Sequence, residues 1–234
     1  MRAGEHDHGA RDAVKIRERL AEATAPDGTV LTLWRHDGAF AIQAGAAELM
    51  STRRSHSEER LAEVACGPLL GVGGARVLIG GLGLGFTLRA ALRVLATDAR
   101  VSVAEIVPEI IAWNRNPDYA FGRDALEDPR VETVQDDVTN VLRANPGAYD
   151  AILLDVDNGA EALTTAGNAA LYSPRGVRMT VRALRPAGRV AYWSADRDPR
   201  FAAVLRGAGL SVETVQGPAH TSSGGRHALL VGQA

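Results

Sequence analysis

The chain has 234 residues, 46% of them hydrophobic, and a formal net charge of −2. That length suits one large domain, with or without a small appendage, and the charge provides no basic field for nucleic acid. No stretch approaches the ~20 apolar residues of a membrane span, and the polar first ten residues lack the apolar segment of a secretory signal. We therefore expect a cytoplasmic protein whose partner is a small molecule, not nucleic acid or a membrane, and the sequence leaves a homodimer open.

The first 67 residues are predicted to form a tail and a small appendage. Charged and apolar residues at helical spacing predict a helix from Asp12 to Ala23. Two apolar runs, 29–34 and 39–43, flank a His-Asp-Gly turn and predict a β-hairpin, and a further helix is expected over 57–64. We accordingly divide the chain into a tail and helix (1–28), a small β/helix appendage (29–67) and a nucleotide-binding domain (68–234).

From residue 71 onward, apolar runs alternate with helical segments, which predicts a parallel sheet covered by helices on both faces. Strands are expected at 76–80, 100–105, 130–135, 149–155, 188–194, 210–216 and 226–232. Helices are expected near 85–96, 108–116, 138–144, 173–185 and 198–207. The last two strands are joined too closely for a crossover helix, so the last strand is expected to run antiparallel. The fold class is therefore α/β, with a Rossmann-like seven-stranded sheet.

The segment 77–92, VLIGGLGLGFTLRAAL, carries the main functional signal. An apolar strand ends in four closely spaced glycines, Gly80, Gly81, Gly83 and Gly85, and a helix follows. Such a turn brings backbone N–H groups close to a ligand. Phe86 stands where a dinucleotide fold needs a third small residue, which argues against NAD, and no P-loop motif is present. The GxGxG spacing fits folds that bind S-adenosylmethionine (SAM).

Acidic residues follow three consecutive predicted strands. They are Glu105, the pair Asp136 and Asp137, and the pair Asp155 and Asp157. Because the carboxyl ends of parallel strands form the ligand-binding edge of such a sheet, these acids are candidate site residues. Glu105 lies 20 residues after Gly85, a distance that suits a carboxylate binding a ribose diol.

The order of these motifs resembles the spermidine synthase family of polyamine aminopropyltransferases, which share the class I SAM-dependent methyltransferase fold. The resemblance covers about residues 29–216. It rests on the glycine turn and on the segments AEI (104–106), PEII (108–111), DPRV (128–131), QDDV (135–138) and YDAILLD (149–155).

The resemblance implies a role for individual residues. Glu105 would hold the ribose hydroxyls, and Ile106 would pack on the adenine. Asp137 would accept a hydrogen bond from the adenine amino group, while the backbone N–H of Val138 would donate to the ring. Asp155 would be the base that deprotonates an acceptor amine.

Three positions depart from the family pattern. The aspartate of the family's glycine turn, which binds the propyl amine of decarboxylated SAM, is replaced by Gly83. A substrate-binding tyrosine is replaced by Ser57, although the neighbouring glutamate is kept as Glu59. The second acid of the family's Asp-x-x-Asp motif is replaced by Asn158, with Asp157 one residue earlier. Candidate substrate-binding residues are therefore Glu59, Asn158 and Trp193, the last at the end of the fifth strand.

The loss of the glycine-turn acid favours intact SAM, because an aspartate there would repel the α-carboxylate and open backbone N–H groups would bind it. Our first hypothesis is a SAM-dependent transferase that methylates a small-molecule nucleophile, with an amine favoured, Asp155 as base and Asp157 assisting. The second is aminopropyl transfer from decarboxylated SAM to a polyamine, with Asp157 replacing the displaced acid. The third is a non-catalytic SAM-binding scaffold.

No metal is expected, because His6 and His8 lie in the tail with no further ligand in reach. The single cysteine, Cys66, cannot form an internal disulfide, which is consistent with a reducing compartment.

Overall fold

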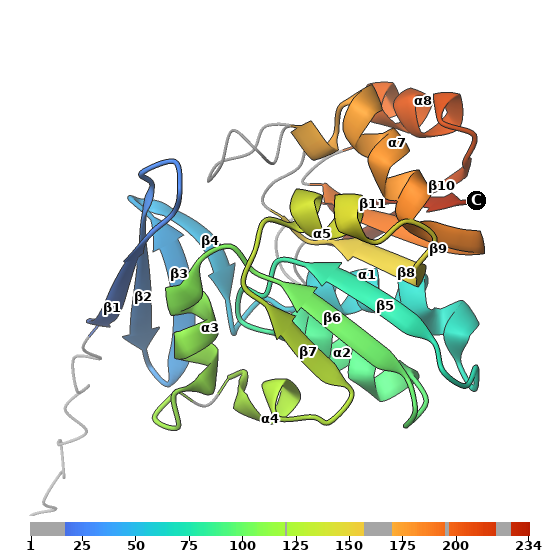
Figure 1. Ribbon diagram of the computed structural model, residues 1–234. Helices are drawn as coiled ribbons and strands as arrows, with labels where there is room; N and C mark the ends of the chain where they lie inside the picture. Colours follow the sequence, from blue (N-terminus) through green and yellow to red (C-terminus); the bar gives the residue numbers. More distant parts are fainter. Residues whose placement is uncertain (1–16, 120, 157–169, 195–196, 219–225) are drawn as a thin grey trace, which may run out of the picture.

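The computed structural model describes residues 17–119, 121–156, 170–194, 197–218 and 226–234. Within these ranges the chain forms two sheets (Figure 1). The larger sheet has seven strands in the order β10-β11-β9-β8-β5-β6-β7. The smaller sheet has four antiparallel strands, β1 to β4, and lies beside the end of the larger one.

Six of the seven strands of the larger sheet lie close to where the apolar runs predict them, whereas β9 begins at Leu184, four residues before its expected start and within the end of the helix expected over 173–185. The seven strands are β5 (Arg76–Gly80), β6 (Arg100–Ala104), β7 (Val131–Val134), β8 (Tyr149–Leu154), β9 (Leu184–Ser194), β10 (Ser211–Pro218) and β11 (Arg226–Gln233). The central pairs are parallel, and β11 runs antiparallel to both β9 and β10. This confirms the expected α/β fold with an antiparallel last strand.

Helices cover both faces of this sheet. They are α1 (His56–Cys66), α2 (Phe86–Val94), α3 (Pro108–Arg115), α4 (Arg123–Leu126), α5 (Val138–Ala144), α7 (Pro174–Ala183) and α8 (Pro199–Gly207), with a short 3-10 turn at Gly67–Leu69. Along β5, Val77 and Ile79 pack into the core that contains α1 and α2, whereas Leu78 packs into the core of α5, α7 and α8. Burial on both faces explains why these strands are continuously apolar in sequence.

The small sheet consists of β1 (Arg17–Thr24), β2 (Val30–His36), β3 (Ala39–Ala44) and β4 (Ala47–Ser51). The expected hairpin is confirmed: Asp37 and Gly38 connect β2 to β3, and both have positive φ (55° and 73°), as a type I′ turn requires. The expected helix up to Ala23 is wrong for the described residues, because Arg17–Thr24 pairs with β2 as a strand. Pairing with an available strand edge overrides the local helical pattern.

The helix α1 follows the small sheet in sequence but packs on the large one. Leu61, Ala65 and Cys66 are buried in the same core as Val77 and Leu88. The helical part of the expected appendage therefore covers the seven-stranded sheet, while the division of the chain at residues 28 and 67 stays a prediction.

Candidate functional site

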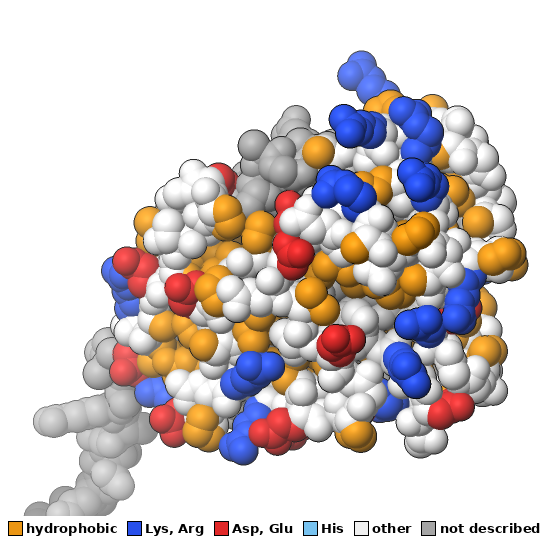
Figure 2. Space-filling view, viewed as in Figure 1, with side chains coloured by type: hydrophobic (Ala, Val, Ile, Leu, Met, Phe, Trp, Pro, Cys, Tyr) orange, Lys and Arg blue, Asp and Glu red, His pale blue; other side chains and the backbone are white. Residues whose placement is uncertain are grey.

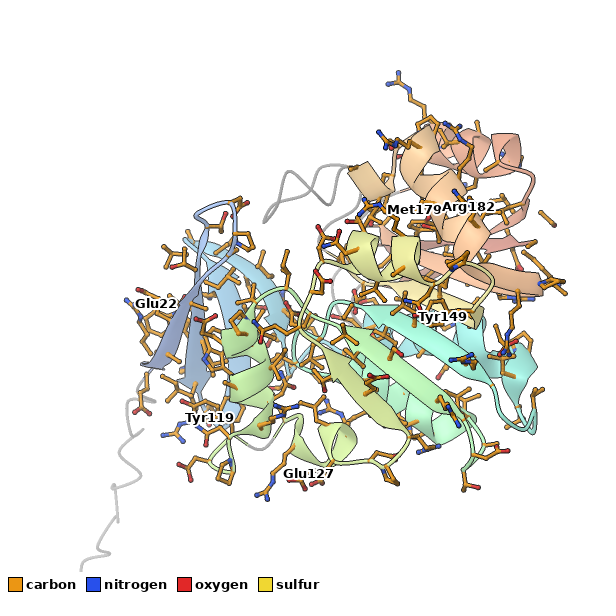
Figure 3. The ribbon with its side chains drawn as sticks, in the orientation of Figure 1. Glu22, Tyr119, Glu127, Tyr149, Met179 and Arg182 are labelled. Carbon is orange, nitrogen blue, oxygen red and sulfur yellow. The ribbon has the colours of Figure 1, made fainter. Side chains whose placement is uncertain are left out.

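A cavity lies where the carboxyl ends of the parallel strands face the small sheet. Tyr149, at the start of β8, lies on the side away from the small sheet, so β8 runs toward it (Figure 3). The small sheet and the residue after β1 contribute an apolar wall of Ala25, Leu31, Ile42, Leu49 and Met50. The opposite wall carries five carboxylates, namely Glu58, Glu105, Asp136, Asp137 and Asp155. Among the described residues that line the cavity there is no Lys, Arg or His.

The glycine turn between β5 and α2 is the floor of this cavity. Gly81, Gly83 and Gly85 have φ values of 90°, 50° and 75°, which residues with a side chain rarely adopt. A Cβ added at Gly81 would lie 2.4 Å from the backbone oxygen of Asp155. The turn therefore needs glycine both for its conformation and for the close approach of β8.

Glu105 fastens this turn to the end of β6. One carboxylate oxygen accepts the backbone N–H of Leu82 and the other accepts that of Val107, each at 2.9 Å. The residue is only 6% exposed, and it lines the cavity together with Ile106. Hydrogen bonds from backbone N–H groups to a buried carboxylate are strong and fix its orientation.

The turn offers fewer open N–H groups than the sequence leads one to expect. The N–H of Gly81 donates to Ala104, and that of Gly85 donates to Leu82. The N–H of Leu84 donates to the sulfur of Met50 at 3.0 Å, while that of Leu82 is held by Glu105. Of the amides from Gly81 to Gly85, only that of Gly83 is left for a ligand. The expectation of an open set of amides for the SAM carboxylate is thus corrected.

Met50 also explains the space around Gly83. A Cβ at Gly83 would lie 2.6 Å from both Sδ and Cε of Met50, which reaches over from β4. The place of the family's aspartate side chain is therefore occupied by a thioether. The glycine can be read from the sequence, but its contact with Met50, 33 positions earlier, arises only when the chain folds.

Asn114 is a second support of the turn that sequence reasoning missed. This fully buried side chain of α3 donates through Nδ2 to the backbone oxygens of Gly83 and Ile110, both at 2.8 Å. A Cβ at Gly122 would lie 1.8 Å from its Oδ1. The sequence does contain an indication of this role: the amide side chain of Asn114 lies in the apolar helix segment IIAWN, and a buried Asn needs hydrogen-bond partners.

The acids after β7 stand at the start of α5. Oδ1 of Asp137 caps this helix by accepting the N–H of Thr139 at 2.7 Å, and Oδ1 of Asp136 accepts from Asn140 at 2.8 Å. Both acids line the cavity, as does Val138. A Cβ at Gly80 would lie 2.9 Å from Cγ2 of Val138, so glycine at position 80 leaves room for this side chain. Figure 2 shows acidic side chains beside α5 and hydrophobic side chains between the two sheets.

Asp155 follows β8 directly and lies at the cavity wall beside Trp193. Its Oδ2 accepts a hydrogen bond of 2.7 Å from the hydroxyl of Thr87, in the first turn of α2. That hydroxyl also lies 3.4 Å from the backbone oxygen of Glu58. The start of α1, the start of α2 and the end of β8 therefore meet at one point.

The structure places Glu58, not Glu59, in the cavity. Glu59 accepts a hydrogen bond from Ser55 and pairs with Arg93 at 3.5 Å, and it is not among the residues that line the cavity. Glu58 is 8% exposed, and burial raises the pKa of its carboxyl above the ordinary value. The rotation of α1 about its axis decides which of two adjacent glutamates faces inward, and the sequence does not specify it.

Asp157 and Asn158 lie outside the described residues. Within the described ranges, no group of three or more His, Cys, Asp and Glu side chains could hold a metal ion. In the same part of the chain, no helix has the length and apolar character to cross a bilayer.

No protein-family model matches the chain. A polyamine aminopropyltransferase 2 from Streptomyces coelicolor is 34% identical over 167 residues, which cover 67% of this chain. The chain is spermidine-synthase-like. It spans only 29% of that relative's length.

Solved structures support the same fold for this spermidine-synthase-like chain. A spermidine synthase in complex with the transition-state analogue AdoDATO superposes with a TM-score of 0.69 at 17% identity, covering 92% of this chain and 72% of the other. A Burkholderia thailandensis 1,6-didemethyltoxoflavin-N1-methyltransferase bound to 1,6-didemethyltoxoflavin and S-adenosylhomocysteine gives 0.54 at 17% identity, covering 76% and 78%. The class I methyltransferase fold is thus common to all three.

Proposed function

We propose that the chain binds an adenosyl sulfonium compound and transfers an alkyl group from it to an amine. The observation that carries this proposal is the charge of the cavity wall. Five carboxylates and no basic side chain, among the described residues, line a cavity at the ligand edge of the sheet. A sulfonium and an ammonium group are both cations, and such a wall favours them over anionic or neutral ligands.

The residues around the glycine turn fit an adenosyl group. Gly81 lets the backbone of the turn come close to β8, and Glu105 stands rigid at the end of the neighbouring strand. We propose that Glu105 binds the ribose hydroxyls and that Ile106 and Val138 pack on the adenine. Asp136 and Asp137 would bind the polar edge of the base.

We propose that Asp155 accepts the proton of the acceptor. A free alkylamine has a pKa near that of lysine, about 10, so it must lose a proton before it can attack. The hydroxyl of Thr87 holds the Asp155 carboxylate in place at the end of β8. The nitrogen lone pair forms the new C–N bond, the C–S electron pair leaves with sulfur as a neutral thioether, and the proton passes to Asp155.

Aminopropyl transfer is our first choice of reaction. The curated relative is named for it, and the solved spermidine synthase shares the fold over 92% of this chain. Decarboxylated SAM would be the donor, and the carboxylates of the cavity wall would face the cationic end of its arm. Alignment of the two reactants in such a site can supply roughly 7–11 kcal/mol of the barrier reduction.

Methyl transfer from intact SAM is the second candidate, on a specific observation. The side chain of Met50 fills the space where an acid at position 83 would stand, so that place offers no charge to the amine of decarboxylated SAM. A methyl donor needs no such anchor. A scaffold that only binds the nucleoside would have no need for Thr87 to hold Asp155.

The two reactions leave different nucleosides. The purified chain is incubated with SAM or decarboxylated SAM and a panel of primary amines, and the nucleoside is identified by mass spectrometry. We expect methylthioadenosine from decarboxylated SAM; S-adenosylhomocysteine from SAM would instead support the second candidate. Absence of both products, while either donor binds by calorimetry, would refute the transferase proposal and leave a binding protein.

A further inference from the structure

Glu58 is a buried carboxylate in the cavity wall that the reaction described above does not use. It lies in the first turn of α1, is 8% exposed and accepts a hydrogen bond from the hydroxyl of Ser57. Among the described residues Glu58 forms no ion pair; His56, two residues earlier, favours its charged form, but by less than burial disfavours it. A buried carboxylate without an ion-pair partner is costly in free energy, and a cation in the cavity would reduce that cost.

Glu58 is also close to the proposed base. Thr87 donates to Asp155 at 2.7 Å, and the same hydroxyl lies 3.4 Å from the backbone oxygen of Glu58. Both acids line the same cavity. A nitrogen atom that gives its proton to Asp155 would therefore be next to the helix turn that carries Glu58.

The opposite wall has a different character. The small sheet and its flanking residue present Ala25, Leu31, Ile42, Leu49 and Met50, all apolar. A ligand with a nitrogen atom at Asp155 would extend its other end along this wall. An alkyl or aromatic group gains free energy from that contact, whereas a second ammonium group would lose its hydration there.

We propose that Glu58 binds the ammonium group of the acceptor and that the acceptor is a monoamine with an apolar body. This inference rests on the proposed function for the identity of the site. Glu58 stabilises the cationic nitrogen before the proton transfer and again in the alkylated product, and the apolar wall selects what is attached to the nitrogen. Burial raises the pKa of the Glu58 carboxyl, and a bound ammonium group would act on that pKa in the opposite direction.

Binding of hexylamine, 1,4-diaminobutane and hexanol, measured by calorimetry in the presence of methylthioadenosine, tests this inference. We expect the unmodified protein to bind hexylamine more tightly than either of the others. Glu58→Gln keeps the shape and an acceptor for Ser57 but removes the charge, so it should weaken hexylamine binding by a factor of roughly 10 to 100 and leave hexanol unchanged. Glu63→Gln, at an exposed position of the same helix, is the matched control and should change neither.

Two results would overturn the inference. Unchanged hexylamine binding in Glu58→Gln would remove Glu58 from the site, and tighter binding of the diamine than of hexylamine would exclude an apolar acceptor. Turnover separates this test from that of the proposed function. Normal turnover in Glu58→Gln would support the proposed function and refute the role of Glu58. Glu58-dependent binding of hexylamine without turnover of any donor would support the role of Glu58 and refute the proposed function.

Discussion

The five acids of the cavity wall are each held by a different local contact. Glu105 accepts two backbone N–H groups, Asp137 caps a helix, and Asp155 accepts a threonine hydroxyl. These contacts fix carboxylate orientation before any ligand binds. A fixed carboxylate contributes more to the binding free energy than a mobile one, because no conformational entropy is lost in ordering it when the ligand binds.

Replacement of Asp155 by Asn keeps the side-chain shape but removes the proton acceptor. Turnover should fall by roughly 10²–10⁴-fold, while affinity for the adenosyl donor changes little, since the proposed ribose and adenine contacts come from residues that follow β6 and β7. Single-turnover kinetics and calorimetry measure the two quantities separately. Thr87→Val, which removes the hydroxyl that contacts Asp155 and the backbone oxygen of Glu58, should give a smaller loss. Full turnover in Asp155→Asn would exclude Asp155 as the base.

Replacement of Glu105 by Ala leaves two buried backbone N–H groups without their acceptor. We expect the free energy of unfolding to fall by about 1.5–3 kcal/mol for each hydrogen bond to the carboxylate that is lost, less what water regains by bonding to the two N–H groups. The free energy of donor binding should fall by more than the free energy of unfolding. Urea unfolding and calorimetry measure the two effects. Glu109→Gln, at an exposed position in the first turn of α3, is the control. Unaltered donor affinity in Glu105→Ala would remove the residue from the ribose site.

At the scale of elements, the glycine turn is held from both sides. Asn114 of α3 binds its carbonyl at Gly83, and Met50 of β4 accepts its N–H at Leu84. The turn is thus fixed partly by a strand of the other sheet, so the small sheet shapes the donor site as well as covering it.

A double-mutant cycle at Met50 and Gly83 measures this contact. Gly83→Ala should lower stability by about 2 kcal/mol or more, from the positive φ and from the clash with Met50. In a Met50→Ala background the steric part disappears, which gives a coupling of about 1–3 kcal/mol by urea unfolding. Additive effects would show that the two residues do not touch. In the same background, Gly83→Asp should shift donor preference toward decarboxylated SAM.

For the whole molecule, α1 joins the small sheet to the large one and carries Cys66 into the common core. Burial raises the pKa of the Cys66 thiol to about 12 from an ordinary value of 9.0. Because the folded pKa is the higher one, the thiol's contribution to stability is complete below pH 9 and is lost as the pH rises toward 12.

Unfolding measured at pH 8 and at pH 10.5 tests this burial. The unmodified chain should lose about 2 kcal/mol more stability over that interval than Cys66→Ala, because only its unfolded state gains a thiolate. The native protein should also resist thiol reagents at pH 8. Rapid labelling without denaturant, or equal losses in both proteins, would contradict the buried position of α1.

Many of the basic side chains on the face drawn in Figure 2 lie far from the cavity. Figure 2 shows a group of Arg side chains over α7 and α8, on the side away from the small sheet, and Figure 3 places Arg182 there. The described residues that line the cavity include five acids and no basic side chain, so the cavity wall is acidic although the net charge of the chain is only −2.

Apart from the short helix α4 and the start of β9, the sequence by itself determined the strands and helices of the large sheet, the glycine turn and the acids at its carboxyl edge. Local periodicity determines these features, because strands buried on both faces are continuously apolar and tight turns need glycine. Tertiary structure decided the rest. β1 became a strand because β2 offered an edge, Glu58 faces the cavity because α1 is rotated that way, and Met50 reaches Gly83 because two sheets meet. Each of these depends on contacts between distant segments, which no local pattern encodes.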